Sequence, residues 1–237
     1  MLEFQNFSKI YKGGHRAVDG LTLRVAPGEL CAFIGHNGAG KTTSLKAAAG
    51  ILDFEEGDIL VGGVSVKADP LACKRQLAYI PDEPRLYPNL TGLQYLSFIG
   101  DIYGVSAAER RARIEQYAGA FELTGNLGDL IATYSHGMKQ KLALVSAFLH
   151  QPRLLLLDEP FVGLDPTAAL TLRGFMRELC GAGGAIFFST HVLETAEKLC
   201  DRVAIIRRGK LAAAGGMDEV RRNESLESVF VELMEDV

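Results

Sequence analysis

Residues 30–43 read LCAFIGHNGAGKTT: an uninterrupted apolar run is followed by a glycine-rich loop, a lysine and two threonines. The run predicts a buried strand, and the residues after the loop predict a helix. Between them, residues 35–42 satisfy the pattern GxxxxGK(S/T) at every specified position. Glycines let successive N–H groups turn inward and the helix start adds a positive dipole end, so the loop predicts a cage for phosphate oxygens. We expect Lys41 to reach the β- and γ-phosphates of a nucleotide and the Thr42 hydroxyl to ligate Mg²⁺.

A second apolar run, 154–157, ends in two carboxylates, Asp158 and Glu159. In a fold built on a phosphate loop, a carboxylate at this strand end approaches the Mg²⁺ shell, so Asp158 is predicted as a metal ligand. Glu159 would lie beside the metal and face the γ-phosphate, where it can polarise a water for in-line attack. Hydrolysis is therefore favoured over binding alone or transfer to a second substrate. A solvated strand end is the alternative, and the matching phosphate loop argues against it.

The distribution of apolar residues predicts an α/β fold with helices against a mixed sheet. Continuous apolar runs, typical of buried parallel strands, occur at 30–34, 77–80, 154–157 and 185–188. Alternating apolar and polar residues, typical of antiparallel strands, occur at 2–7 and 21–25, and a glycine hairpin turn lies within 58–66. A late hairpin is predicted over 203–214.

We expect one domain, 1–237, with a P-loop NTPase (RecA-like) core, an antiparallel β subdomain and an inserted α-helical subdomain. The core is assigned to 1–83 and 151–225, the helical subdomain to 84–150, and a C-terminal helix to 226–237. That helix follows from apolar residues at helical spacing, with Ser225 available as N-cap. The simplest interpretation packs it on its own domain.

Net charge, apolar run length and cysteine spacing argue against several classes of protein. The formal net charge of the 237 residues is −4, so the chain lacks the basic excess typical of proteins that bind nucleic acid. No apolar run approaches the ~20 residues that cross a bilayer, so we expect any membrane-spanning part on another chain. The four cysteines form no CxxC pair and no secretory leader is evident, which favours reduced thiols in the cytoplasm.

Five motifs, in this order, resemble those of the nucleotide-binding subunits of ABC (ATP-binding cassette) transporters. They are the phosphate loop at 35–42, the signature-like YSHGMKQ at 134–140, the strand end at 158–159, GLD at 163–165 and STH at 189–191. The resemblance covers nearly the whole chain, and YSHGMKQK with PDEPRLYPNLTG is similar to the ABC-2-type exporter subfamily. It implies an ATPase that binds ATP and Mg²⁺ and powers transport, by subfamily likeness export, through a separate transmembrane permease subunit.

The resemblance also implies roles for individual residues. Tyr11 takes the place of the aromatic that stacks on adenine, with a half-buried strand tyrosine as the alternative. His191 takes the place of the histidine that contacts the γ-phosphate. The implied catalytic residues are Lys41, Glu159 and His191; the ATP-binding residues are Tyr11, Gly35, His36, Asn37, Gly38, Ala39, Gly40, Lys41, Thr42, Thr43, Ser135, Gly137 and Asp165; the metal ligands are Thr42, Asp82 and Asp158.

Two positions depart from the family pattern. Asp82 stands where the family usually has Gln; a carboxylate can coordinate Mg²⁺ or a water, yet when ionised it cannot donate a hydrogen bond. The signature reads YSHGM in place of LSGGQ, and Ser135 and Gly137 remain as groups that can serve a phosphate at a helix N-terminus. His136 either adds charge near the γ-phosphate or is a solvent-facing substitute, and we favour the second interpretation.

In the family, Ser135 and Gly137 contact the ATP held by the other subunit. Two cassettes, identical or different, are therefore expected to pair about a two-fold axis and bury two ATP molecules. The segment 85–92 would pass the closure of this dimer to the permease. We expect a cytoplasmic protein, peripheral on the inner face of the cell membrane through its permease, with no nucleic-acid partner.

Three rival interpretations remain. A soluble ABC-type ATPase without a membrane subunit usually has two cassettes in one chain or long coiled coils, and neither pattern occurs in the sequence. A P-loop kinase has no need of the signature or of Glu159. A degenerate cassette that binds without hydrolysis is disfavoured by intact Lys41, Asp158, Glu159 and His191.

Overall fold

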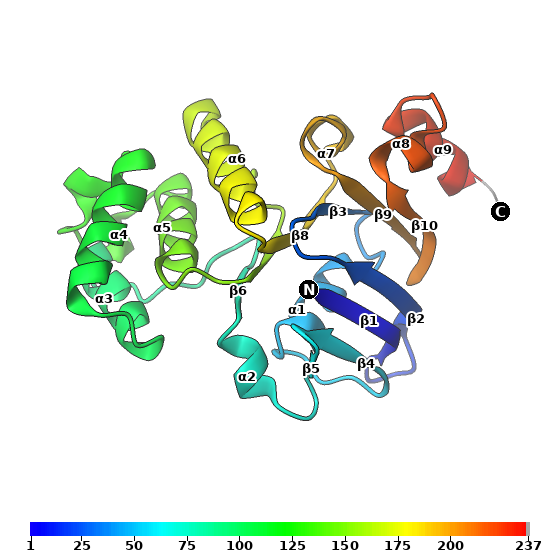
Figure 1. Ribbon diagram of the computed structural model, residues 1–237, viewed down its shortest axis with the longest axis horizontal. Helices are drawn as coiled ribbons and strands as arrows, with labels where there is room; N and C mark the ends of the chain where they lie inside the picture. Colours follow the sequence, from blue (N-terminus) through cyan, green and yellow to red (C-terminus); the bar gives the residue numbers. More distant parts are fainter. Residues whose placement is uncertain (236–237) are drawn as a thin grey trace. The chain divides into compact units, whose positions relative to one another are not determined.

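The computed structural model describes residues 1–235, which form two compact units (Figure 1). The first unit comprises Met1–Tyr79, Arg153–Pro160 and the described part of Met176–Val237. The second comprises Ile80–Pro152 and Phe161–Phe175. Each unit is built from its own packed elements, described in turn below.

Within residues 1–235, a six-stranded sheet with the order β10-β9-β3-β8-β7-β6 forms the centre of the first unit. Its strands are β3 (Leu30–Ile34), β6 (Leu77–Ile80), β7 (Leu154–Asp158), β8 (Ala185–Thr190), β9 (Arg202–Arg207) and β10 (Lys210–Gly216). Strand β8 pairs in parallel with both β3 and β7, so the carboxyl ends of all three meet at one edge. Every residue of these three strands is buried, which explains their continuous apolar runs.

A second, antiparallel sheet has the order β2-β1-β4-β5 in the described chain. Its strands are β1 (Leu2–Ile10), β2 (Arg16–Val25), β4 (Glu56–Val61) and β5 (Val64–Ser65). Strands β1 and β2 are longer than the alternating pattern predicts, because the pairing register shifts between Phe4 and Phe7. Asn6, with φ 51°, lies in this irregularity and lets both phenylalanines enter the core although they are three residues apart.

Both sheets of the first unit share one apolar core. Phe187 of β8 lies 5.8 Å, ring centre to ring centre, from Phe4 of β1 and 4.9 Å from Phe33 of β3. Leu45 of helix α1 (Lys41–Ala48), which follows the phosphate loop, is fully buried in the same cluster. This packing holds β3 and β8 firmly behind the loops at their carboxyl ends.

Helices make up the second unit. They are α3 (Gly92–Ile102), α4 (Ala107–Ala120), α5 (His136–Leu149) and the first part of α6 (Pro166–Gly181), with short 3₁₀ turns at Thr124–Asn126 and Ile131–Thr133. Reciprocal capping boxes begin α3, through Thr91 and Gln94, and α4, through Ser106 and Glu109. Each of these two helices therefore begins directly after its capping residue.

The remaining helices belong to the first unit: α2 (Pro70–Lys74), α7 (Leu193–Leu199), α8 (Met217–Arg221) and α9 (Leu226–Glu235). Ser225 caps α9 as predicted, since its Oγ accepts a hydrogen bond of 3.1 Å from the Ser228 N–H. Residues 236–237 of the predicted C-terminal helix lie outside the described residues. In the described part of the chain, no helix combines the length and apolarity needed to span a bilayer.

Candidate nucleotide-binding site

The phosphate loop joins β3 to α1 at the edge where the parallel strands end. Gly38 and Gly40 have φ values of 79° and 111°, which side chains of L-residues rarely adopt. A Cβ on Gly40 would lie 2.6 Å from the carbonyl oxygen of Ala17, so space as well as conformation requires glycine there. Within residues 1–235, no side chain caps the N-terminus of α1. The N–H groups of its first turn, where Thr42 and Thr43 lie, can therefore serve an anion.

The Lys41 side chain is buried at the base of the loop. Its ammonium donates to the carbonyl oxygens of Gly35, at 2.5 Å, and His36, at 3.2 Å. Burial lowers the pKa of Lys41, and the nearby carboxylates of Glu159 and Asp158 oppose that shift. A cation thus lies between the phosphate loop and the two predicted catalytic and metal-binding carboxylates.

Tyr11 lies one residue beyond the end of β1 and is exposed. Its hydroxyl is 3.3 Å from the Thr43 Oγ1 on α1, and the Lys9 ammonium lies 5.6 Å from its ring centre. The exposed ring therefore lies beside the first turn of the helix that follows the phosphate loop. Stacking of this ring on adenine stays a prediction.

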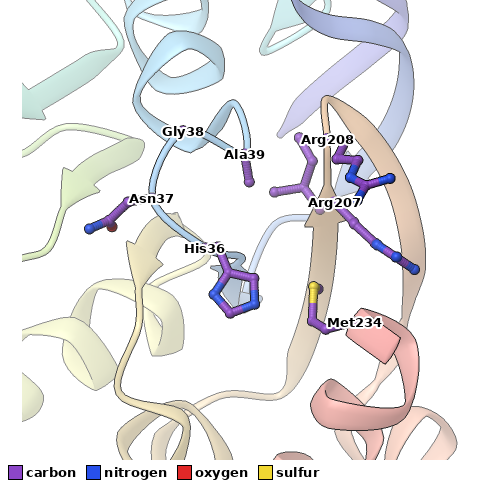
Figure 2. A pocket seen from close by; sticks show the side chains of 8 residues that line it. His36, Asn37, Gly38, Ala39, Arg207, Arg208 and Met234 are labelled. Carbon is purple, nitrogen blue, oxygen red and sulfur yellow. The ribbon is translucent and has the colours of Figure 1, made fainter. Parts of the chain in front are cut away.

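A pocket of about 270 Å³ lies beside the loop, lined by His36, Asn37, Gly38, Ala39, Ile206, Arg207, Arg208 and Met234. Figure 2 shows His36 and Met234 of α9 on facing sides of this pocket. The His36 ring is 5.1 Å from that of Phe230, and the Arg207 Nη1 donates to the Leu233 carbonyl oxygen at 2.8 Å. Helix α9 therefore packs against the phosphate loop through His36, within the first unit.

The carboxylate of Asp158 is held at the end of β7. Asp158 is only 2% exposed, and its Oδ1 accepts a hydrogen bond of 2.5 Å from the Ser189 Oγ. The other oxygen, Oδ2, is buried and has no hydrogen-bond partner among the residues that the structure describes. Because such an oxygen is costly to leave unsatisfied, this donor set fits a divalent cation.

Glu159 follows in an uncommon backbone conformation. Its φ is 48°, and its N–H points at β8, where the Ser189 Oγ and the Ser189 carbonyl oxygen accept it at 3.0 and 3.2 Å. The Glu159 Oε2 lies 2.9 Å from the His191 Nδ1. The His191 side chain is 60% exposed, so this pair of groups reaches solvent. A carboxylate oriented by an imidazole can act as a general base toward a water.

The signature-like segment begins α5 in the second unit. Ser135 caps this helix, its Oγ accepting from the Met138 N–H at 3.2 Å. A Cβ on Gly137 would lie 2.8 Å from the Gly163 carbonyl oxygen, and a Cβ on Gly163 would meet the His136 ring. The two glycines therefore bring the signature segment and the loop at 163–165 into close contact, with the exposed His136 against that loop.

Asp165 and Asp82 also belong to the second unit. Both Asp165 oxygens have partners there: Oδ1 accepts from the Ala168 N–H at 2.8 Å, and Oδ2 pairs with the Lys141 ammonium at 2.7 Å. The hydrogen bond from Lys141 lowers the pKa of Asp165. Asp82 is exposed, and its Oδ1 accepts from the Glu83 N–H. The metal role of Asp82 and the nucleotide role of Asp165 stay predictions.

Known proteins share this architecture. A family model described as ABC transporter matches residues 18–162. The Linearmycin resistance ATP-binding protein LnrL of Bacillus subtilis (strain 168) is 35% identical over 218 residues, which cover 91% of this chain and 69% of the relative. The chain belongs to the ABC transporter family.

Two further comparisons extend over almost the full length of this ABC ATPase. The ABC-type transporter ATP-binding protein EcsA of the same organism is 34% identical over 221 residues, covering 91% of this chain and 90% of the relative. A solved structure described as the ATP binding subunit of an ABC transporter is 38% identical, with a TM-score of 0.95, and the match covers 99% and 100% of the two chains. The predicted family and the predicted P-loop NTPase (RecA-like) fold are confirmed, and the chain is an ATP-binding ATPase subunit.

The first unit of this ABC ATPase brings together most of the predicted site: Tyr11, the loop 35–43, Asp158, Glu159 and His191. The sequence reasoning missed Ser189, which bonds to both carboxylate residues. A signal was present, because this serine follows four apolar residues of a buried strand and lies two positions before His191. Its meaning depends on strand pairing, which the sequence pattern does not contain.

Two glycines of the phosphate loop provide a matched test of its geometry. We expect Gly38→Ala to lower the free energy of unfolding by about 1–2 kcal/mol, the cost of a left-handed conformation, since a Cβ there meets no atom of residues 1–235 within 4 Å. Gly40→Ala should cost a further ~1–3 kcal/mol, because its Cβ would collide with Ala17. Urea unfolding without nucleotide measures both. Equal losses would contradict the close approach at Gly40.

Proposed function

We propose that this ABC ATPase hydrolyses ATP at the edge of the first unit's parallel sheet and thereby powers export through a separate transmembrane subunit. The observation that carries the proposal is the set of groups around Asp158 and Glu159. One oxygen of Asp158 is buried without a hydrogen-bond partner in the part of the chain that the structure describes, and Glu159 is held against His191. The name of the relative LnrL, a linearmycin resistance protein, supports export over import.

Nucleotide binding is assigned to the phosphate loop and Tyr11. The loop N–H groups and Lys41 would hold the β- and γ-phosphates, and the exposed ring of Tyr11 would stack on adenine. The Thr42 hydroxyl and the free oxygen of Asp158 would hold Mg²⁺, whose charge neutralises the phosphates during transfer. Lys41 contributes a second cation to the same phosphates.

Hydrolysis is assigned to Glu159, with His191 as its partner. Glu159 would accept the proton of the attacking water, and the His191 Nδ1 would hold the Oε2 oxygen in place. That contact would leave the Nε2 of His191 as the ring nitrogen that contacts the γ-phosphate. Because the His191 side chain is largely exposed, its position depends on the contact with Glu159 and on the partner that covers the site.

A second cassette, identical or different, is the proposed source of that closure. Ser135 and Gly137 lie at the N-terminus of α5, where the N–H groups and the helix dipole favour a phosphate. In this proposal they serve the ATP held by the partner cassette. ATP then has higher affinity for the closed pair, and its hydrolysis releases the pair.

A transmembrane subunit is proposed to dock on exposed apolar side chains of the second unit. These are Tyr87, Phe98, Ile102 and Tyr103, beside the segment 85–92. Tyr87 contacts Phe98 edge-on, with ring centres 5.7 Å apart, and Tyr103 stacks on His150 at 3.7 Å. An exposed apolar group of this kind favours an interaction surface. Docking there would hold the chain at the inner face of the membrane.

Glu159→Gln tests hydrolysis and pairing together. We expect ATPase activity to fall about 10²–10⁴-fold, because the amide cannot accept the proton. We also expect a dimer that forms with ATP and persists, measured by light scattering after gel filtration. The control, Lys41→Ala, should lose ATP binding and stay monomeric. Persistent monomer of Glu159→Gln in saturating ATP would contradict the pairing of identical chains.

Ile102→Asp tests the docking surface. A carboxylate in an apolar interface should reduce co-purification with a multi-helix membrane protein about 30-fold, the size of a hot-spot loss. The matched control is Leu71→Asp, an equally exposed leucine of α2 in the first unit. Both variants should keep the ATPase activity of the isolated subunit. Equal co-purification of the Ile102→Asp and Leu71→Asp variants would contradict docking on this surface.

A further inference from the structure

We propose that Ser189 is a positioning residue for the hydrolysis site: its hydroxyl selects which Asp158 oxygen is left for Mg²⁺ and holds the backbone from which Glu159 reaches the attacking water. The inference rests on the roles proposed above for Asp158 and Glu159. Ser189 lies outside the phosphate loop, and in this inference it acts through Asp158 and Glu159 and not on the nucleotide itself.

One hydroxyl serves both carboxylate residues. Ser189 is fully buried, and its Oγ donates to the Asp158 Oδ1 at 2.5 Å while accepting from the Glu159 N–H at 3.0 Å. A serine hydroxyl has one donor and two acceptor positions, so both bonds can form at once. The register of the sheet brings them about, because Asp158 and Ser189 are paired residues of β7 and β8.

The first bond fixes the rotation of the Asp158 carboxylate. A hydroxyl that donates to a carboxylate makes a charge-assisted hydrogen bond, which is stronger than one between neutral groups. With Oδ1 committed to Ser189, Oδ2 remains the oxygen without a partner in the described chain. Hydrogen bonds of this kind orient metal-binding carboxylates, and losing them typically weakens metal affinity about 10–100-fold.

The second bond holds the backbone of Glu159. A non-glycine residue at φ 48° is strained and persists only where its surroundings impose the conformation. Here the Glu159 N–H is accepted by the Oγ of Ser189 and also, at 3.2 Å, by the Ser189 carbonyl oxygen. The conformation directs the Glu159 side chain toward His191. Ser189 therefore acts on hydrolysis through Glu159 as well as on metal binding through Asp158.

The apolar surroundings of Ser189 require its hydroxyl to have hydrogen-bond partners. The four preceding residues of β8 are apolar and fully buried, and a hydroxyl in such a strand costs free energy unless it is bonded. The neighbouring hydroxyl, that of Thr190, accepts instead from the Val192 N–H in the following loop. Ser189, which is paired with Asp158 across the strands, is therefore the one of the two whose hydroxyl bonds to Asp158 and Glu159.

The test measures Mg²⁺ dependence of nucleotide binding, by fluorescence of methylanthraniloyl-ATP in EDTA and across a Mg²⁺ titration. For Ser189→Ala we expect the Mg²⁺ concentration at half-saturation to rise about 10–100-fold, with binding in EDTA unchanged. Ser189→Thr keeps the hydroxyl and should return the midpoint toward wild type. The thiol of Ser189→Cys is a weak hydrogen-bond donor, so this variant should raise the Mg²⁺ midpoint as Ser189→Ala does. If Ser189→Ala fails to fold, Ser189→Cys takes its place in the test.

Controls separate this inference from the proposed function. Ser8→Ala removes another buried serine hydroxyl of the first unit, one that accepts from the Gly20 N–H, and should leave the Mg²⁺ midpoint unchanged. Asp158→Ala should raise the midpoint; if it does not, the metal role of Asp158 fails. If Asp158→Ala raises it and Ser189→Ala stays within about threefold of wild type, a loss well below that of a lost metal-orienting bond, the role of Ser189 is overturned. An equal loss of binding in EDTA and in Mg²⁺ would also overturn it, since that is a general structural effect.

Discussion

Parallel pairing of β8 with β3 on one side and β7 on the other is the constraint on which the site depends. It aligns Ile34 with Thr190 and Asp158 with Ser189, so the three strands end at one level. The phosphate loop, the carboxylate pair and His191 each follow one of these ends. The apolar core behind them, with Phe187 in contact with both sheets, keeps the strand ends from shifting.

Three locally unfavourable features of the first unit gather at this edge. Lys41 is buried and has a lowered pKa, and Glu159 has a left-handed backbone. The Asp158 Oδ2 is buried and has no hydrogen-bond partner among residues 1–235. Each costs free energy in isolation. The buried apolar residues of β3, β7 and β8 behind the edge offset these costs, which is the usual relation between a scaffold and a functional site.

Much of the fold could be predicted from the sequence, because buried parallel strands, the phosphate loop and the capped helices each leave a local pattern. The strands around 30–34 and 77–80 were predicted at their observed bounds. The extension of β1 was not, because the irregularity at Asn6 resets the alternation on which the prediction depends. The bonds of Ser189 and the packing of α9 on His36 were beyond reach for another reason: they join residues about 30 to nearly 200 positions apart through strand register and tertiary packing. The roles of Ser135 and Gly137 depend on a second chain and stay predictions.

The most direct measurement is a crystal structure of the Glu159→Gln chain with ATP and Mg²⁺. The predicted result is a metal shell on the Oδ2 side of Asp158, with the Ser189 Oγ still within hydrogen-bond distance of both Oδ1 and the backbone nitrogen of residue 159. A metal shell on Oδ1, or a Ser189 hydroxyl turned away from both groups, would contradict it.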